Sequence, residues 1–323
     1  MSHTYSVVVT WNGQDYIRAC LQSLRRSTVP VSIIVVDNAS SDGTRDIVRE
    51  ACSEATLIRL RHNLGFGRAN NIGIKHAYDW GAEHVLLLNQ DAYVKPDTVG
   101  GLIELMQTHS DYGILSPLHL DGSEECLDRR FGLHLAKSSG ISQLLSDQLL
   151  SKQQASIYDV EFVNAAIWLL SRECIERVGL FNPAFEQYGE DREYADRVRF
   201  QGLRVGVVPA LCGVHDRKQD RSEDNASLER YFLKEKSIIR YRLSRKTPGI
   251  AFNLLSALSR VVFSRPPGVG SFLRRIGARL VLLYAFFVSV PTVLRTRAVA
   301  YGGQRCFFEA AKEDRIRYLS QRE

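Results

Sequence analysis

Short apolar runs alternate with amphipathic segments over the first hundred residues of the chain. Four of these runs are rich in β-branched or leucine residues and have the length of buried strands: residues 5–10, 31–36, 56–60 and 83–88. Between them, apolar side chains recur at helical spacing over residues 16–24 and 47–52, and a third helix is predicted over residues 68–78. Such alternation indicates a mostly parallel sheet covered by helices on both faces. We therefore predict an α/β fold with ligands bound outside the carboxyl ends of the strands.

The pattern is less regular after residue 120. Residues 121–159 are polar and rich in Ser and Gln, and we interpret them as an inserted loop region that faces the substrate. Regular structure is expected again over residues 160–170, followed by a helix over Glu190–Phe200 and a last strand over residues 203–208. A charged stretch, residues 216–224, then leads to a basic C-terminal part. The catalytic part of the chain is therefore expected to end near this stretch.

Charge divides the chain into two parts. From Met1 to Glu229 there are 23 Lys and Arg against 31 Asp and Glu, whereas residues 230–300 hold 14 basic residues and the single acid Glu235. Regions of opposite charge are expected to have different partners. The expected units are an N-terminal α/β domain over about 1–229, which divides near residue 118, and a C-terminal helical region over 230–323.

The basic part mixes arginines with apolar runs, of which residues 280–294 form the longest. That run has 15 uncharged residues between Arg279 and Arg295, fewer than the ~20 that a membrane-spanning helix needs. We favour an amphipathic hairpin whose arginines contact an anionic membrane surface. A helical subdomain packed on the catalytic core and an oligomer contact are the alternatives. Nucleic acid is a weaker explanation, because the sequence has no recognition motif for it.

The N-terminal residues and the cysteines bear on the compartment. The segment Met1-Ser2-His3-Thr4-Tyr5 lacks the basic and apolar parts of a secretory signal. The six cysteines lie far apart and form no CxxC pair, which argues against a zinc module and against a disulfide framework. We therefore expect reduced thiols in a cytoplasmic protein at the inner face of the cell membrane.

Polar residues gather at the ends of the predicted strands. The first strand runs into Thr10-Trp11-Asn12 and the second into Asp37. An acid after a buried strand can accept a hydrogen bond from a nucleobase or a ribose hydroxyl. Asp37 is therefore a candidate nucleoside contact, with a plain turn as the alternative.

A glycine-rich segment, residues 63–73, follows the third strand and opens a helix. Gly65 and Arg68 are candidates to approach a diphosphate, whereas Gly73 is expected to permit close helix packing. A dinucleotide-binding fingerprint needs a glycine where Asn70 stands and an acid at the end of the next strand. The acid at that strand end, Asp91, belongs to a different motif, so a Rossmann oxidoreductase is excluded.

Three leucines end in Asn89-Gln90-Asp91, which is the most specific feature of the sequence. Alternation along an extended segment sends the side chains of Asn89 and Asp91 to the same side. Mg²⁺ and Mn²⁺ are bound through oxygen ligands, often one or two carboxylates together with substrate phosphates. Asp91 with Asn89 is therefore a candidate metal site. His215, after the last strand, is a candidate third ligand, with a structural role as the alternative.

Two carboxylates stand at the start of the helix predicted from Glu190. The helix dipole stabilises acids at this position, which is a sufficient reason for either one. A general base for an acceptor hydroxyl also belongs at such an edge, close to the donor. Asp191 is the candidate base and Glu190 the alternate.

Taken in order, these motifs resemble those of the GT-A-fold glycosyltransferases of family 2, especially the bacterial rhamnosyltransferase-like branch. The resemblance spans about residues 5–215 and rests on five ordered motifs, at residues 10–12, 37–44, 63–67, 89–91 and 188–191. Residues 163–166 also resemble the acceptor-side segment of that family. This similarity implies acceptor-binding roles for Asn164, Ala165 and Trp168.

The resemblance further implies that the catalytic domain over 1–229 has a donor half over about 1–118 and an acceptor half over about 119–229. It implies that Asp37 binds a nucleotide-sugar donor together with Thr10, Asn12, Asn89 and Gln90. It implies that Asp91 binds Mg²⁺ or Mn²⁺ on the donor diphosphate and that Asp191 deprotonates the acceptor. The usual two-carboxylate metal motif of the family is Asn89-Gln90-Asp91 here, which leaves one carboxylate.

The implied activity is inverting transfer of a sugar to a cell-surface glycan or a lipid-linked acceptor. The first choice of donor is dTDP-rhamnose. Transfer of galactose or N-acetylglucosamine from a UDP donor stays open, as does a non-catalytic module that binds glycan or nucleotide. Nucleotidyl transfer is less favoured, because no glycine- and basic-rich loop follows the first strand.

Overall fold

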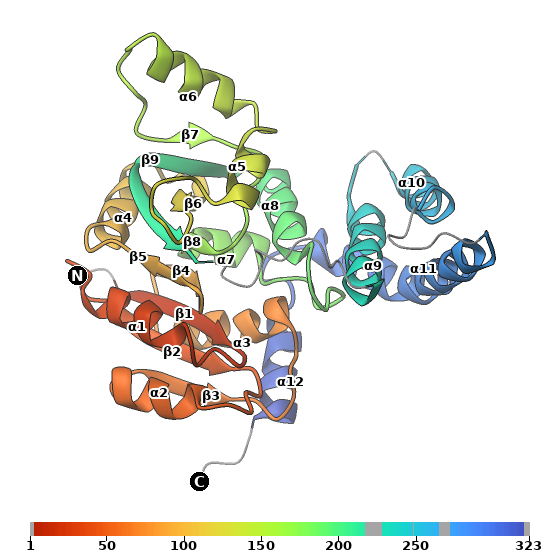
Figure 1. Cartoon of the computed structure of the whole chain (residues 1–323), viewed down its shortest axis with the longest axis horizontal. Coiled ribbons are helices and arrows are strands. Elements are labelled where there is room, and N and C mark those ends of the chain that lie inside the picture. The colour runs from red at the N-terminus through yellow and green to blue at the C-terminus, as the bar shows by residue number, and fades with distance from the viewer. Residues whose placement is uncertain (1–2, 217–227, 248, 265–271, 320–323) are drawn as a thin grey trace.

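The computed structural model describes residues 3–216, 228–247, 249–264 and 272–319. Within these residues, nine strands form one sheet in the order β3-β2-β1-β4-β8-β6-β9-β5, with β7 paired to β9 (Figure 1). The strands are β1 Thr4–Thr10, β2 Ser32–Asp37, β3 Thr56–Arg59, β4 His84–Asn89, β5 Ala92–Val94, β6 Tyr112–Leu120, β7 Tyr158–Asp159, β8 Ile167–Ser171 and β9 Arg204–His215.

The first half of the chain has the predicted architecture. Strand β1 pairs in parallel with β2 and β4, and β2 pairs in parallel with β3. The helices are α1 Ile17–Arg25, α2 Thr44–Ala51 and α3 Phe66–Asp79. Val7 of β1 belongs to the same buried cluster as Ile72 of α3, whereas Val8 belongs to the cluster that contains Leu21 of α1. The expected α/β fold, with helices on both faces of the sheet, is therefore confirmed.

The second half of the sheet is mixed. Strand β8 runs antiparallel to both β4 and β6, while β9 pairs in parallel with β6. Helices α4 Thr98–Thr108, α7 Arg172–Val178 and α8 Glu190–Phe200 accompany these strands. Strand β9 continues past its predicted end at residue 208 to His215, where it meets β5 and aligns His215 with Ala92. This pairing brings the segment after β4 next to the end of β9.

Residues 121–159 are not the loop that their composition suggests. They contain α5 Arg129–Leu135, α6 Gly140–Leu149 and the short strand β7. The Asp128 carboxylate caps α5 by accepting a hydrogen bond from the Phe131 backbone N–H at 2.7 Å. Phe131 and Leu135 are buried, so tertiary packing rather than a periodic pattern fixes this short helix.

The C-terminal region is divided between two places. Helices α9 Leu228–Ser244, α10 Ile250–Val262 and α11 Phe272–Ala300 share a core that also includes Phe185 of the catalytic domain. Helix α12 Phe308–Tyr318 instead returns to α3, beside which it lies in Figure 1. The last helix of residues 230–323 therefore packs on α3, apart from the core that α9 to α11 share. Of the charged stretch expected at residues 216–224, all but Asp216 lies outside the described residues.

Candidate active site

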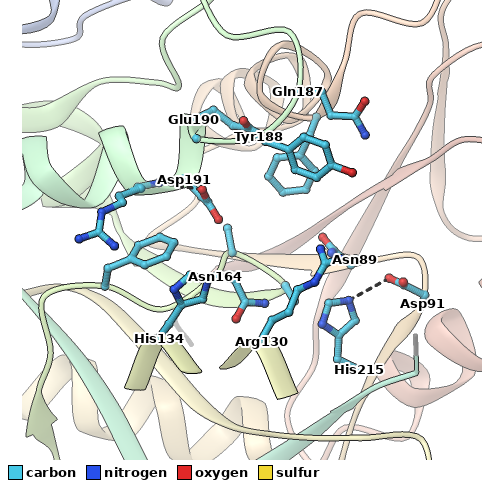
Figure 2. Close-up of a pocket in the computed structure, with 16 residues that line it drawn as sticks. Asn89, Asp91, Arg130, His134, Asn164, Gln187, Tyr188, Glu190, Asp191 and His215 are labelled. Atoms are coloured by element: carbon cyan, nitrogen blue, oxygen red, sulfur yellow. Dashed lines mark hydrogen bonds and ion pairs between the residues drawn. The ribbon is translucent and has the colours of Figure 1, made fainter. Parts of the chain in front are cut away.

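A cavity of about 420 Å³ lies at the carboxyl end of β4, between the sheet and the start of α8 (Figure 2). Its walls come from distant segments: the end of β4, helix α5, residues 162–166, residues 187–192 and the end of β9. All of the predicted catalytic and metal-binding residues line it, together with two predicted acceptor contacts: Asn89, Asp91, Glu190, Asp191 and His215, with Asn164 and Ala165. The fold thus gathers predicted residues that lie as far apart as Asn89 and His215, 126 positions, into one site.

The three predicted metal ligands meet at one end of this cavity. His215 Nε2 lies 3.3 Å from Asp91 Oδ1, and the imidazole is 2% exposed. The Asp216 backbone N–H donates to the Asp91 carbonyl at 2.8 Å, which fixes the two segments together. Asn89 lines the same end and completes a set of one carboxylate, one imidazole and one amide.

This donor set fits a divalent cation that is partly held by its substrate. Carboxylate and amide oxygens suit Mg²⁺ and Mn²⁺, which keep open positions for phosphate oxygens. Among the described residues, no three His, Cys, Asp or Glu side chains gather closely enough to hold a metal ion by themselves. A cation at Asp91 would therefore need Asn89 and the phosphates of a bound donor to complete its coordination.

The two carboxylates at the start of α8 lie on the opposite side of the cavity from Asp91 (Figure 2). Burial raises the pKa of both groups, and the neighbouring Asp191 charge raises the pKa of Glu190 further. Glu190 is 5% exposed and its Oε2 atom has no hydrogen-bond partner, whereas Asp191 is partly exposed and accepts from the Arg192 backbone N–H at 2.8 Å. Of the pair, Asp191 is the more exposed side chain.

A strained loop precedes these carboxylates. Tyr188 and Gly189 have φ values of 68° and 86°, in the left-handed region. The Ser237 hydroxyl of α9 donates to the backbone carbonyl of Gln187 at 2.9 Å and also contacts that of Tyr188. On its other side, a Cβ built on Gly65 would lie 1.8 Å from the Glu186 carbonyl oxygen. Helix α9 and the Gly65 turn therefore hold this loop against the cavity, and close backbone approach accounts for that glycine.

The remaining predicted donor contacts lie at the same sheet edge but do not line the cavity. The Thr10 hydroxyl donates to Gln90 Oε1 at 2.7 Å, and Asn12 Oδ1 accepts from the Ser41 backbone N–H at 2.9 Å. Asp37 is 1% exposed and accepts from the Ser40 backbone N–H at 3.0 Å. These contacts order the turns after β1, β2 and β4. Their role toward a nucleotide stays a prediction.

Two predicted contacts are wrong. Arg68 forms a bidentate ion pair with Asp314 of α12, at 2.8 and 2.5 Å, so its side chain is directed to the C-terminal helix instead of a diphosphate. Trp168 is fully buried in the core beside Tyr194, with ring centroids 6.3 Å apart, and cannot contact an acceptor. Gly73 does serve helix packing as predicted, because an added Cβ would lie 2.4 Å from Val7 Cγ1.

Several cavity residues were not expected from the sequence. Arg130 and His134 come from α5, which lies within the predicted loop, and Gln187 comes from the loop before α8, next to the 188–191 motif. The spacing of Arg130 and His134, four residues apart after the capping Asp128, is the signal that could have placed both on one helical face.

Comparison with known proteins agrees with this geometry. The family described as Glycosyl transferase family 2 matches residues 6–173. The chain is 25% identical over 266 residues to the low-salt glycan biosynthesis hexosyltransferase Agl10 of Haloferax volcanii, covering 78% of this chain and 80% of that protein. It is also 25% identical over 240 residues to the N-acetylglucosaminyl-diphospho-decaprenol L-rhamnosyltransferase of Mycobacterium tuberculosis, covering 68% and 78%.

The fold has solved counterparts as well. The structure of mannosyltransferase PcManGT from Pyrobaculum calidifontis, in complex with GDP-Man and Mn²⁺, superposes with a TM-score of 0.52 at 19% identity. That superposition covers 97% of this chain and 80% of the mannosyltransferase. The family match includes β1 to β4 and the Asn89-Gln90-Asp91 motif, of which Asn89 and Asp91 line the cavity. The chain therefore belongs to glycosyl transferase family 2 and is an enzyme that transfers sugar from a nucleotide donor.

Proposed function

We propose that this enzyme transfers rhamnose from dTDP-rhamnose, with inversion at the anomeric carbon, to a lipid-linked or cell-surface glycan acceptor. One observation carries the mechanistic part of the proposal: Asp191 and the Asp91–His215 pair lie on opposite sides of one cavity (Figure 2). A base on one side and a diphosphate site on the other suit a single in-line displacement.

In this mechanism Asp191 accepts the proton of the acceptor hydroxyl as the acceptor oxygen bonds to the anomeric carbon. The bond from that carbon to the phosphate oxygen breaks at the same time, and its electron pair leaves with the nucleoside diphosphate. A divalent cation held by Asp91, Asn89 and His215 would stabilise the charge of the leaving group. Burial raises the pKa of Asp191 and so favours proton uptake by its carboxylate.

The choice of sugar rests on similarity. The mycobacterial relative is named as an L-rhamnosyltransferase that acts on N-acetylglucosaminyl-diphospho-decaprenol. Its acceptor is thus a sugar linked to a lipid diphosphate, and we propose the same class of acceptor here. A UDP donor of galactose or N-acetylglucosamine is the alternative. The manganese in the Pyrobaculum mannosyltransferase structure supports Mn²⁺ as well as Mg²⁺ for the metal.

A lipid-linked acceptor requires access to a membrane, and we propose that α10 and α11 supply it at the inner face of the cell membrane. Their exposed surfaces carry large apolar side chains: Phe252, Leu255, Phe263, Leu280, Tyr284 and Phe287, each at least 58% exposed. No acid occurs between Glu235 and Glu309, a stretch that contains 13 Lys and Arg. Apolar area rimmed by basic charge is typical of proteins that lie on anionic bilayers.

Helix α11 is also longer than its uncharged run suggests. Its segment Ile276–Ala300, 25 residues, is long and apolar enough to cross a membrane. In the most apolar part of this segment, 33% is buried in the protein. Because α9 and α10 cover one side of this helix, we favour contact with the membrane surface over spanning. Sedimentation with vesicles tests this: anionic vesicles should retain the chain, and Leu280→Ser with Phe287→Ser should weaken retention, while Ile316→Ser on α12 should not.

Turnover of a donor panel tests the enzymatic proposal. Release of nucleoside diphosphate is measured from dTDP-rhamnose, UDP-galactose and UDP-N-acetylglucosamine, with Mn²⁺ and with a polyprenyl-diphosphate-linked N-acetylglucosamine as acceptor. The proposal expects dTDP-rhamnose to be turned over fastest and a chelator to stop the reaction. Preference for a UDP donor would refute the choice of sugar. Binding of nucleotide without turnover of any donor would favour the non-catalytic module.

A further inference from the structure

Helix α5 places a cation in the cavity that the mechanism above does not use. Arg130 and His134 both line the cavity and stand four residues apart on this helix. The helix is fixed from behind, because Phe131 is fully buried and stacks on His119, with ring centroids 4.3 Å apart. The Asp128 cap at its first turn adds a second constraint. Arg130 therefore projects from a rigid support.

Arg130 and His134 lie on different sides of the cavity. His134 contacts Phe162 edge-on, with ring centroids 4.8 Å apart, on the side of Asp191 (Figure 2). Arg130 lies between Asn164 and His215, and its guanidinium is directed toward Asn89 (Figure 2). The cation of Arg130 is thus at the metal end, where a donor diphosphate is expected.

The charge at this end also calls for a second cation. A divalent metal whose one carboxylate ligand is Asp91 keeps only a small net positive charge. This charge is smaller than the negative charge of the leaving nucleoside diphosphate, so the metal alone does not neutralise it. An arginine fork can donate two parallel hydrogen bonds to phosphate oxygens. Donors aimed at the site where charge develops lower the barrier of the displacement.

We propose that Arg130 binds the terminal phosphate of the nucleoside diphosphate and stabilises its charge as the sugar–phosphate bond breaks. This inference rests on the proposed nucleotide-sugar chemistry and assigns a further catalytic residue to it. The position of Arg130 near Asn89 favours the donor phosphate over a phosphate on the acceptor, which would enter beside Asp191.

Calorimetric titration of the full chain with nucleotides tests the assignment. UDP and dTDP are compared with UMP and dTMP, each with Mn²⁺, on wild type, Arg130→Gln and Arg129→Gln. Arg129 is the matched control, since it is the exposed neighbour of Arg130 on the same helix and does not line the cavity. We expect Arg130→Gln to weaken diphosphate binding by about 10- to 100-fold and to leave monophosphate binding unchanged. Arg130→Lys should restore part of the loss.

Three results would overturn the inference. The first is that Arg130→Gln binds diphosphate like wild type, the second that it loses mono- and diphosphate binding equally, and the third that it raises only the KM for the acceptor. A thermal midpoint for Arg130→Gln equal to that of Arg129→Gln shows that the variant is folded. If Arg130→Gln is not folded, the same binding measurements are made on Arg130→Lys. If wild type binds none of the four nucleotides, the proposed function fails as well, whereas normal diphosphate binding by Arg130→Gln refutes this inference alone.

Discussion

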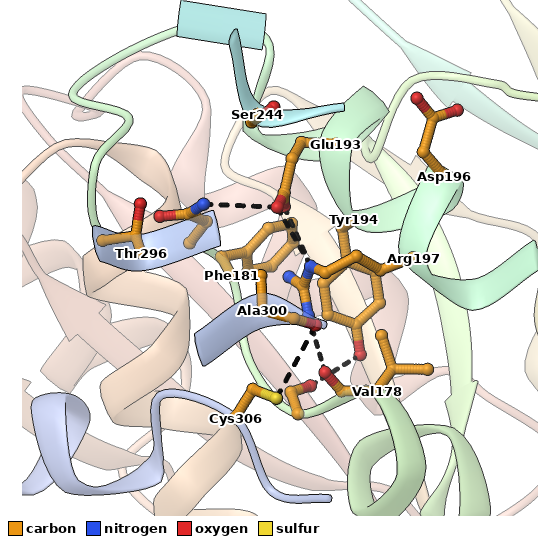
Figure 3. Close-up of polar contacts among 12 residues, drawn as sticks. Val178, Phe181, Glu193, Tyr194, Asp196, Arg197, Ser244, Thr296, Ala300 and Cys306 are labelled. Atoms are coloured by element: carbon orange, nitrogen blue, oxygen red, sulfur yellow. Dashed lines mark hydrogen bonds and ion pairs between the residues drawn. The ribbon is translucent and has the colours of Figure 1, made fainter. Parts of the chain in front are cut away.

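A buried ion pair between Glu193 and Arg197 fixes the helix that carries the candidate base (Figure 3). The Nε–Oε2 distance is 3.0 Å, and both side chains are 1% exposed. Arg197 also donates to the backbone carbonyls of Val178 and Leu180, at 2.6 and 2.7 Å. These contacts attach α8 to the turn after α7. Replacing Arg197 with Met removes all of them at once.

The cost follows from what Arg197→Met leaves behind. The Glu193 carboxylate keeps a hydrogen bond from Asn182 at 3.2 Å but loses its counterion inside the protein. Breaking a buried pair in this way costs about 3–5 kcal/mol. At ~2 °C per kcal/mol for a chain of this size, the thermal midpoint should fall by about 6–10 °C. The exposed pair of Arg49 and Asp46 gives the control, and Arg49→Met should cost less than about 1 kcal/mol.

Thermal unfolding of the double variant Glu193→Leu/Arg197→Met tests whether the unpaired Glu193 charge causes the loss of stability in Arg197→Met. Removing both charges should recover part of the loss, because an uncompensated carboxylate no longer remains in the core. The stability that Arg197→Met loses relative to wild type should also be smaller at low pH. Burial already raises the pKa of Glu193, so the folded protein takes up the proton first as pH falls. A double variant as unstable as Arg197→Met, at every pH, would refute the reasoning.

Two further predictions concern the residues around the cavity. Glu190→Gln should leave the rising limb of the pH–rate profile in place, because burial rather than the Glu190 charge raises the pKa of Asp191; a limb that moves to lower pH would contradict this. Stability from the raised pKa values is present below the ordinary carboxyl range and is lost as pH rises through the folded-state values. Gly65→Ala should destabilise the protein more than Gly81→Ala. Both residues have φ near +80°, but only Gly65 faces a carbonyl oxygen, so equal midpoints would show that the loop of Glu186 simply moves.

The donor half of the fold was predictable because its strands are buried on both faces and end in polar motifs. Asn89 and Asp91 could be placed at the rim from alternation alone, and Glu190 and Asp191 from their position at a helix start. Helix α5 left only a weak local signal, the Asp128 cap and the spacing of Arg130 and His134, because its seven residues depend on the burial of Phe131.

Long-range contacts explain the other misses. Arg68 and Asp314 are 246 residues apart, and no local signal indicates that α12 returns to α3. Trp168 lies on a strand with both faces buried, so alternation could not show which side chains reach the cavity. Both side chains are oriented by packing between distant segments, which the pattern of a single strand or helix does not indicate.

The central claim is that Asp191 is the base of a sugar-transfer reaction. Its most direct test is steady-state transfer from the preferred nucleotide sugar by wild type and Asp191→Asn, with Mn²⁺ and with nucleoside diphosphate affinity measured on the same samples. The account predicts a loss of turnover of about 10²- to 10⁴-fold with unchanged diphosphate affinity. Wild-type turnover by Asp191→Asn, in a protein that binds diphosphate normally, would contradict it.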